Sequence, residues 1–241
     1  MIAKNSATLI VALLLMTLAG CSSTVMMDDP TIPEPRVVKI PVSVLLRIPE
    51  QFESFVHEED VLGKESWTIN LGRANATFFT QLFAHLFTDV TIIGPDDDAR
   101  DFEFDALIEP SIDGFEFSVP NQSKTEAFAV WIRYRLRIFD RDGNNASNWT
   151  VSAYGKSQKA GIGGKDSLQR AAVLAMRDAA ALIVMQMDKV TKISSLANGG
   201  TATPISEPVK MAADTASKQS EQDGELDYGI FAIGGIEDDS E

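Results

Sequence analysis

The chain has 241 residues, of which 44% are hydrophobic and 23% charged, so it is long and apolar enough to bury a core. Its net charge of −14 excludes a general nucleic-acid-binding role, because phosphate binding depends on Lys and Arg. One Cys and two His exclude a disulfide framework and leave few ligands for a zinc site. We therefore expect a folded domain that uses no metal and no cofactor.

Residues 1–20 have the layout of a secretory signal peptide. Lys4 supplies a positive charge, and residues 9–15 form an apolar stretch too short to span a bilayer. Residues 18–21, Leu-Ala-Gly-Cys, resemble the bacterial lipobox, the cleavage motif of lipoprotein signal peptidase. The resemblance implies that Cys21 becomes the N-terminus and carries acyl chains that hold the protein to a membrane. Ser22, in place of an Asp retention signal, implies the outer membrane, with the domain facing the periplasm.

The rest of the chain divides into three parts. Residues 21–36 contain the lipidated Cys and three Pro, and they predict a short tether. Residues 37–193 carry all of the strong periodicity and predict the periplasmic domain. Residues 194–241 hold two basic and ten acidic residues, a net charge of −8. Their polar composition predicts a disordered acidic tail that ends in an apolar segment.

Within the domain, the pattern predicts a succession of strands and helices. The predicted strands or extended segments are residues 37–48, 67–70, 89–93, 104–119, 128–139 and 149–156. Residues 71–87 predict a helix, because their apolar positions recur at i, i+3, i+4 and i+7. Asp166 and Gln169 have capping-box spacing at the start of a second helix that runs to Met187.

This order predicts an α+β fold, with two helices packed on one face of a mostly antiparallel four- to five-stranded sheet. Together with the lipobox and the tether, it resembles three groups of envelope lipoproteins. They are the lipopolysaccharide-assembly lipoprotein LptE, auxiliary lipoproteins of envelope ABC transporters, and lipoprotein activators of peptidoglycan synthases. The resemblance implies a non-catalytic accessory or assembly factor of a cell-envelope complex. The alternatives are a carrier for lipid or lipopolysaccharide, or an activator of a peptidoglycan synthase.

One strand carries a first candidate for partner binding. Its candidate residues are Trp131, Arg133, Arg135 and Arg137. Period-two spacing places them on one face of the strand. That face predicts either a stripe that binds a lipid phosphate or an acidic protein surface, or a solvent face with cross-strand ion pairs. The acids that would form those pairs are Glu109, Asp113 or Glu116.

The tail carries a second candidate. Residues 226–236 form an apolar island flanked by acids, and such segments dock into grooves or add a strand to a sheet edge. The candidate contact residues are Tyr228, Ile230, Phe231 and Ile233. The alternative is that this segment folds back on its own domain or has no role.

The sequence contains no motif that indicates catalysis. His57 and His85 fall in no pattern with a nucleophile, so we expect no enzymatic activity. Residues 161–167 are glycine-rich but lack the spacing of a phosphate-binding loop. The acids of residues 96–105 and 140–144 lack the spacing of a calcium loop. We expect function to rest on the membrane anchor and an envelope protein partner, with a lipid or glycolipid ligand as the alternative.

Overall fold

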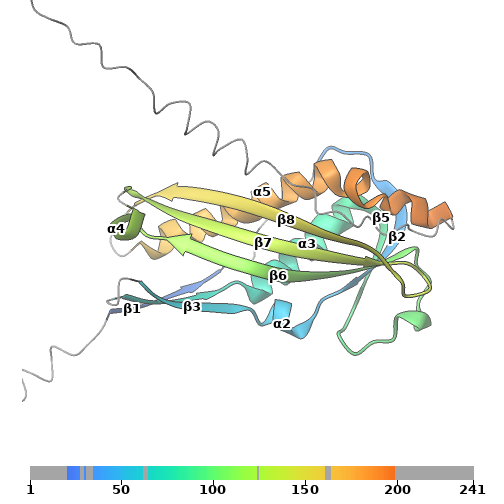
Figure 1. Ribbon diagram of the computed structural model, residues 1–241, viewed down its shortest axis with the longest axis horizontal. Coiled ribbons are helices and arrows are strands. Elements are labelled where there is room, and N and C mark those ends of the chain that lie inside the picture. Colours follow the sequence, from blue (N-terminus) through green and yellow to red (C-terminus); the bar gives the residue numbers. More distant parts are fainter. Residues whose placement is uncertain are drawn as a thin grey trace, which may run out of the picture. The chain divides into compact units, whose positions relative to one another are not determined.

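The computed structural model describes residues 21–27, 30, 35–61, 65–123, 125–160 and 164–198 (Figure 1). The strands are β1 (Cys21–Met26), β2 (Ile40–Arg47), β3 (Val56–Val61), β4 (Glu65–Asn70), β5 (Phe87–Ile93), β6 (Ala106–Ser118), β7 (Ala127–Phe139) and β8 (Asn145–Gln158). The α-helices are α2 (Glu50–Glu53), α3 (Gly72–Leu86), α4 (Pro120–Ser123) and α5 (Lys165–Thr191), and the 3-10 helices are η1 (Ala99–Asp101) and η2 (Ile193–Asn198). These elements confirm the predicted α+β fold class.

The larger sheet has five strands in the order β5-β2-β6-β7-β8. The β6-β7-β8 part is antiparallel, in agreement with the predicted antiparallel sheet. β2 pairs in parallel with both β5 and β6. The connection from β2 to β5 contains α3, and parallel neighbours require a long crossover of this kind. The mixed pairing therefore follows from the position of the first long helix between two strands.

A smaller sheet has the order β1-β4-β3. β1 runs parallel to β4, and β3 is antiparallel to β4. β1 falls within residues 21–36, so the prediction of a tether is wrong for residues 21–26. The physical reason is burial, because Val25 on β1 is only 3% exposed and packs into the core beside Trp67 and Ile69 of β4. The polar strand β3 is also an element that the sequence pattern does not predict.

Both long helices cover the same face of the larger sheet, which we call the inner face (Figure 1). From Val130 onward, β7 alternates between buried and more exposed residues, and its residues on the inner face, from Phe128 to Ile138, are buried. α3 adds a row of phenylalanines that packs against Tyr134 of β7. α5 lies directly on β8, where a Cβ added to Gly155 would come within 2.0 Å of the Ala171 carbonyl oxygen. The alanine-rich side of α5 and this glycine let helix and strand approach closely.

The ends of α5 differ from the prediction. The helix begins at Lys165 after Gly164, which has a φ of 74°, so Asp166 lies in the first turn and is not the N-cap. It runs past Met187 to Thr191. η2 then brings Leu196 into the core at 5% exposure, so residues 194–198 belong to the domain and not to the tail. Among the described segments, no helix combines the length and the apolar character needed to cross a bilayer.

Candidate functional site

The opposite face of β6, β7 and β8, which we call the outer face, is exposed to solvent. α3 and α5 pack on the inner face, and the smaller sheet reaches the same side. The ring of Trp67 on β4 lies 6.0 Å from that of Phe117 and 6.2 Å from that of Phe128, both of which belong to the inner face. The outward residues of β7 from Trp131 to Arg137, and those of β8 from Asn148 to Lys156, are exposed or partly exposed. This bare sheet surface holds the first set of predicted binding residues.

An aromatic pair occupies the outer face near the start of β7. Trp131 lies directly opposite Tyr154 on β8 and opposite Glu116 on β6. The two rings have centroids 5.0 Å apart, and their residues remain 44% and 42% exposed. Paired aromatic rings supply a rigid apolar surface with hydrogen-bonding groups at the edge. An exposed pair of this size on a bare sheet is a candidate contact for another molecule.

The three arginines of the predicted row differ in their contacts. Arg137 Nη2 lies 2.9 Å from Glu109 Oε2, and Arg135 Nε donates a 2.7 Å hydrogen bond to Asp113. Asp113 raises the pKa of the Arg135 guanidinium through this hydrogen bond. The cross-strand ion pairs considered as an alternative are therefore present for Arg135 and Arg137. Arg133 has no ion pair with any described residue, and its guanidinium lies beside Gly114.

Lys156 joins Arg133 as a second cation near the aromatic pair. Arg133 is two residues from Trp131 along β7, and Lys156 is two residues from Tyr154 along β8, in the opposite direction along the sheet. Lys156 is exposed and, within the described part of the chain, has no carboxylate partner. We call Trp131, Arg133, Tyr154 and Lys156 the aromatic–cation patch. Tyr154 and Lys156 were missed from sequence, although the period-two alternation of residues 149–156 places both on one face.

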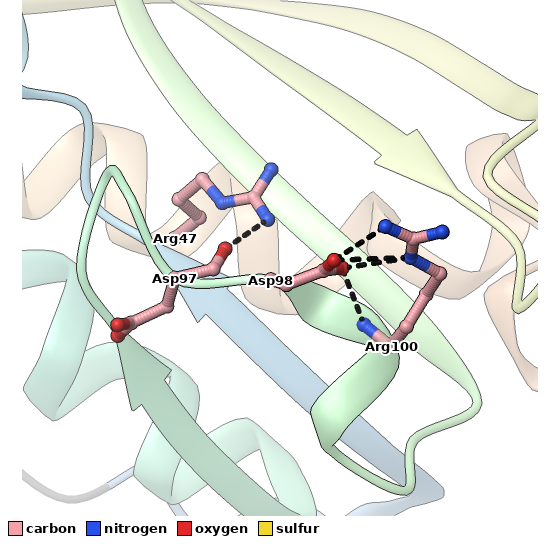
Figure 2. Close-up of polar contacts among 4 residues, drawn as sticks. All are labelled: Arg47, Asp97, Asp98 and Arg100. Carbon is pink, nitrogen blue, oxygen red and sulfur yellow. Dashed lines mark hydrogen bonds and ion pairs between the residues drawn. The ribbon is translucent and has the colours of Figure 1, made fainter.

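A polar network lies on the same outer face at the other end of β7. Arg47 Nη1 donates a 2.7 Å bond to Glu109, which is 9% exposed, so this carboxylate lies between Arg47 and Arg137. Figure 2 shows Arg47 donating to the Asp97 carbonyl oxygen and Asp98 accepting from Arg100. The hydrogen bonds from Arg100 lower the pKa of Asp98 to about 2.

This network borders a cleft of about 530 Å³ whose floor includes Phe104, Leu107 and Phe139. Arg141 at its rim donates to the Phe104 carbonyl oxygen and pairs with Asp105. The guanidiniums around the cleft are thus bound to acids or carbonyl oxygens of the protein itself. These bonds tie loop residues 94–105 to β2 and to the β7–β8 turn, and each guanidinium that lines the cleft already has a partner within the protein.

The remaining predicted site residues are Cys21 and four residues of the tail. Cys21 is the first residue of β1 and pairs with Glu65 of β4. Tyr228, Ile230, Phe231 and Ile233 lie outside the described residues. Within the described ranges, no three His, Cys, Asp or Glu side chains gather closely enough to hold a metal ion.

Comparison with family models and with curated protein sequences finds no match. Among solved structures, the chain is similar to a Xanthomonas campestris protein of the family DUF330, with 13% identity and a TM-score of 0.45 over 74% of this chain and 98% of the other. It is also similar to a minor lipoprotein of Acinetobacter baumannii, with 13% identity and a TM-score of 0.34 over 61% of this chain and 92% of the other. At these values, the similarities establish neither a family nor an activity.

Proposed function

We propose that this protein is a lipid-anchored, non-catalytic accessory factor of a bacterial cell-envelope complex. Acyl chains on Cys21 hold it to the outer membrane, and the domain faces the periplasm. The lipobox at residues 18–21 and Ser22 support the anchor and its location. A protein partner binds on the outer face of the larger sheet. The two parts of the proposal rest on different residues and are tested separately.

The exposed aromatic–cation patch is the observation that supports binding on the outer face. Trp, Tyr and Arg are the residues that most often contribute the largest share of binding energy at protein interfaces. Here Trp131 and Tyr154 are almost half exposed, and neither Arg133 nor Lys156 is neutralised by a described acid. Two cations that no described acid pairs with, beside a rigid aromatic surface, fit a partner that presents acidic and apolar side chains together.

The surroundings of His57 support a binding role over catalysis. Its Nε2 lies 3.2 Å from Glu59, and its ring packs 4.9 Å from Phe115 and 5.9 Å from Phe117. These contacts hold the imidazole between a carboxylate and two phenyl rings. A general base instead needs hydrogen-bond reach to a reacting group. The contacts of this histidine are those of a packed side chain.

The structure does not favour the lipid-carrier alternative. That hypothesis uses the space between helices and sheet for acyl chains and the arginine row for phosphates. Phe78, Phe79 and Phe83 fill the helix–sheet interface and are fully buried. Arg135 and Arg137 are occupied by Asp113 and Glu109. An activator of a peptidoglycan synthase would use the same outer face and differs from the proposal only in the identity of the partner.

Two experiments test the proposal. Mass spectrometry of the protein purified from envelopes should find acyl chains on Cys21, and Cys21→Ala should release the protein from the membrane fraction.

In the second experiment, a photoreactive amino acid replaces Trp131 or Tyr154 in cells. Both positions should give the same protein adduct, whereas Met185, an exposed residue on α5, serves as the matched control and should not. Equal adducts at all three positions, or none at Trp131 and Tyr154, would contradict binding on the outer face.

A further inference from the structure

We infer that the domain stands directly on the bilayer surface, with the end of the smaller sheet at Cys21 and Glu65 as its membrane-facing end. The inference rests on the proposed anchor at Cys21 and adds how the anchored domain is placed. It also places the aromatic–cation patch near the membrane and the Arg47 network far from it.

The pairing of β1 leaves no linker residues between the anchored Cys21 and the folded domain. Cys21 pairs with Glu65, and the ladder continues without interruption to Met26 opposite Asn70. Val25 is buried in the core, which fixes the strand in place. A free tether of fifteen residues could reach about 50 Å. A strand that begins at the anchored residue itself allows no such reach, so the bilayer surface must lie at the start of β1.

Ring contacts establish which end of the larger sheet lies at this level. Trp67 on β4 is opposite Ser23, two residues from Cys21, which corresponds to about 7 Å along the strand. Its ring packs against Phe117 near the end of β6 and Phe128 near the start of β7. The end that carries α4 is therefore the membrane-facing end (Figure 1). β7 leads away from it for thirteen residues, which is about 40 Å.

The position of the patch follows from this geometry. Trp131 lies three residues beyond Phe128, which is about 10 Å further from the bilayer. With the distance from Cys21 to Trp67, the patch lies about 15–20 Å from the anchored residue. The turn at residues 140–144 and the cleft beside it lie at the far end. The partner must therefore present its acidic and apolar contact surface close to the membrane, as an integral or peripheral membrane protein does.

The three tryptophans allow a direct test by energy transfer to dansyl-labelled phosphatidylethanolamine in vesicles of phosphatidylethanolamine and phosphatidylglycerol. The chain from Cys21 onward contains every described element, and Cys21 is its only thiol, so a maleimide lipid couples it at that residue. Transfer from the native tryptophans should be strong. Inserting twenty Gly and Ser residues between Ser22 and Ser23, a coil of about 25 Å, should reduce it several-fold. The same insertion between Gly143 and Asn144, in the far turn, is the matched control and should leave transfer unchanged.

Variants that retain a single tryptophan add a second measurement. Transfer should be strongest from Trp67, intermediate from Trp131 and weakest from Trp149, which pairs with Leu136 far along β7. Equal transfer from the three positions, or no loss on insertion after Ser22, would overturn the inference. Chemical coupling makes the result independent of acylation in cells. Absence of acyl chains on the protein from envelopes would contradict the proposed function. The energy-transfer measurement on the chemically coupled protein would still test the placement of the domain.

Discussion

The hydroxyl of Tyr134 donates a 2.6 Å hydrogen bond to Oδ1 of Asn75 in the interior of the core. Both residues are fully buried, and the contact joins β7 to α3. The rings of Phe78 and Phe79 lie 6.3 Å and 5.2 Å from the tyrosine ring. A single polar contact inside an aromatic cluster thus helps to position the first long helix on the sheet, because a buried polar group without a partner is costly.

Tyr134→Phe should destabilise the domain. The substitution removes the donor and leaves Asn75 Oδ1 buried without a partner, which costs about 1–3 kcal/mol. Adding Asn75→Leu should recover much of that loss, because both polar groups are then absent. Urea unfolding of the two single variants and the double variant measures the coupling between the residues. A Tyr134→Phe variant as stable as the wild type would show that the hydrogen bond contributes nothing.

The same tyrosine should make stability depend on alkaline pH. Desolvation by burial raises the pKa of Tyr134 above its ordinary value of 10. The stability linked to its protonated form is fully present below pH 10 and is lost as the pH rises further, because the unfolded state releases the proton and the folded state retains it. The free energy of unfolding should fall by about 1.4 kcal/mol per pH unit above pH 10. Tyr134→Phe should show a correspondingly smaller slope, and equal slopes would contradict this assignment.

Strong periodicity explains which parts of this fold the sequence predicts. β7 and α3 lie within one residue of their predicted bounds, because strict alternation and helical spacing each report burial of one face. β1 and β3 are short, and they form strands through pairing with β4 and through burial of Val25 and Val61, which a local pattern does not report. The acid partner of Arg135 depends on the register shift between Ile112 and Gly114, which releases Asp113 from the ladder. Local pattern does not encode such a shift.

Gly155→Ala should be among the most destabilising small substitutions in the chain. The new methyl group would come within 2.0 Å of the Ala171 carbonyl oxygen and 2.3 Å of the Ala175 nitrogen, both backbone atoms of α5. The helix must shift, and overpacking of this kind costs about 3 kcal/mol. Gly114→Ala is the matched control on β6, because its nearest neighbour is the mobile end of the Arg133 side chain, at 3.3 Å. Thermal unfolding should show a large loss for the first variant and a small change for the second.

Glu109→Ala should cost more stability than Arg137→Ala, although both remove the same ion pair. Loss of the carboxylate leaves Arg47, whose side chain is 21% exposed, without its acid partner, for a cost of about 2 kcal/mol. The Arg137 side chain is 47% exposed, and its removal should cost less than about 1 kcal/mol. Urea unfolding of the Glu109→Ala and Arg137→Ala variants, at low and high salt, measures the two losses of stability. Equal losses of stability would indicate that the Arg47–Glu109 ion pair contributes little to the free energy of unfolding.

Asp98 should titrate well below an ordinary aspartate. Hydrogen bonds from the Arg100 side chain and backbone lower its pKa from 3.8 to about 2. A depressed pKa in the folded state means that the linked stability is present above pH 3.8 and is lost as the pH falls toward 2. Because the group is exposed, added salt should weaken the charge attraction and raise the observed midpoint. Carbon-13 NMR of the carboxyl groups measures that midpoint, with Asp98→Asn to assign the signal. A midpoint near 3.8 at low salt would show that Arg100 does not hold this carboxylate in solution, and that η1 lacks the N-cap that Asp98 supplies.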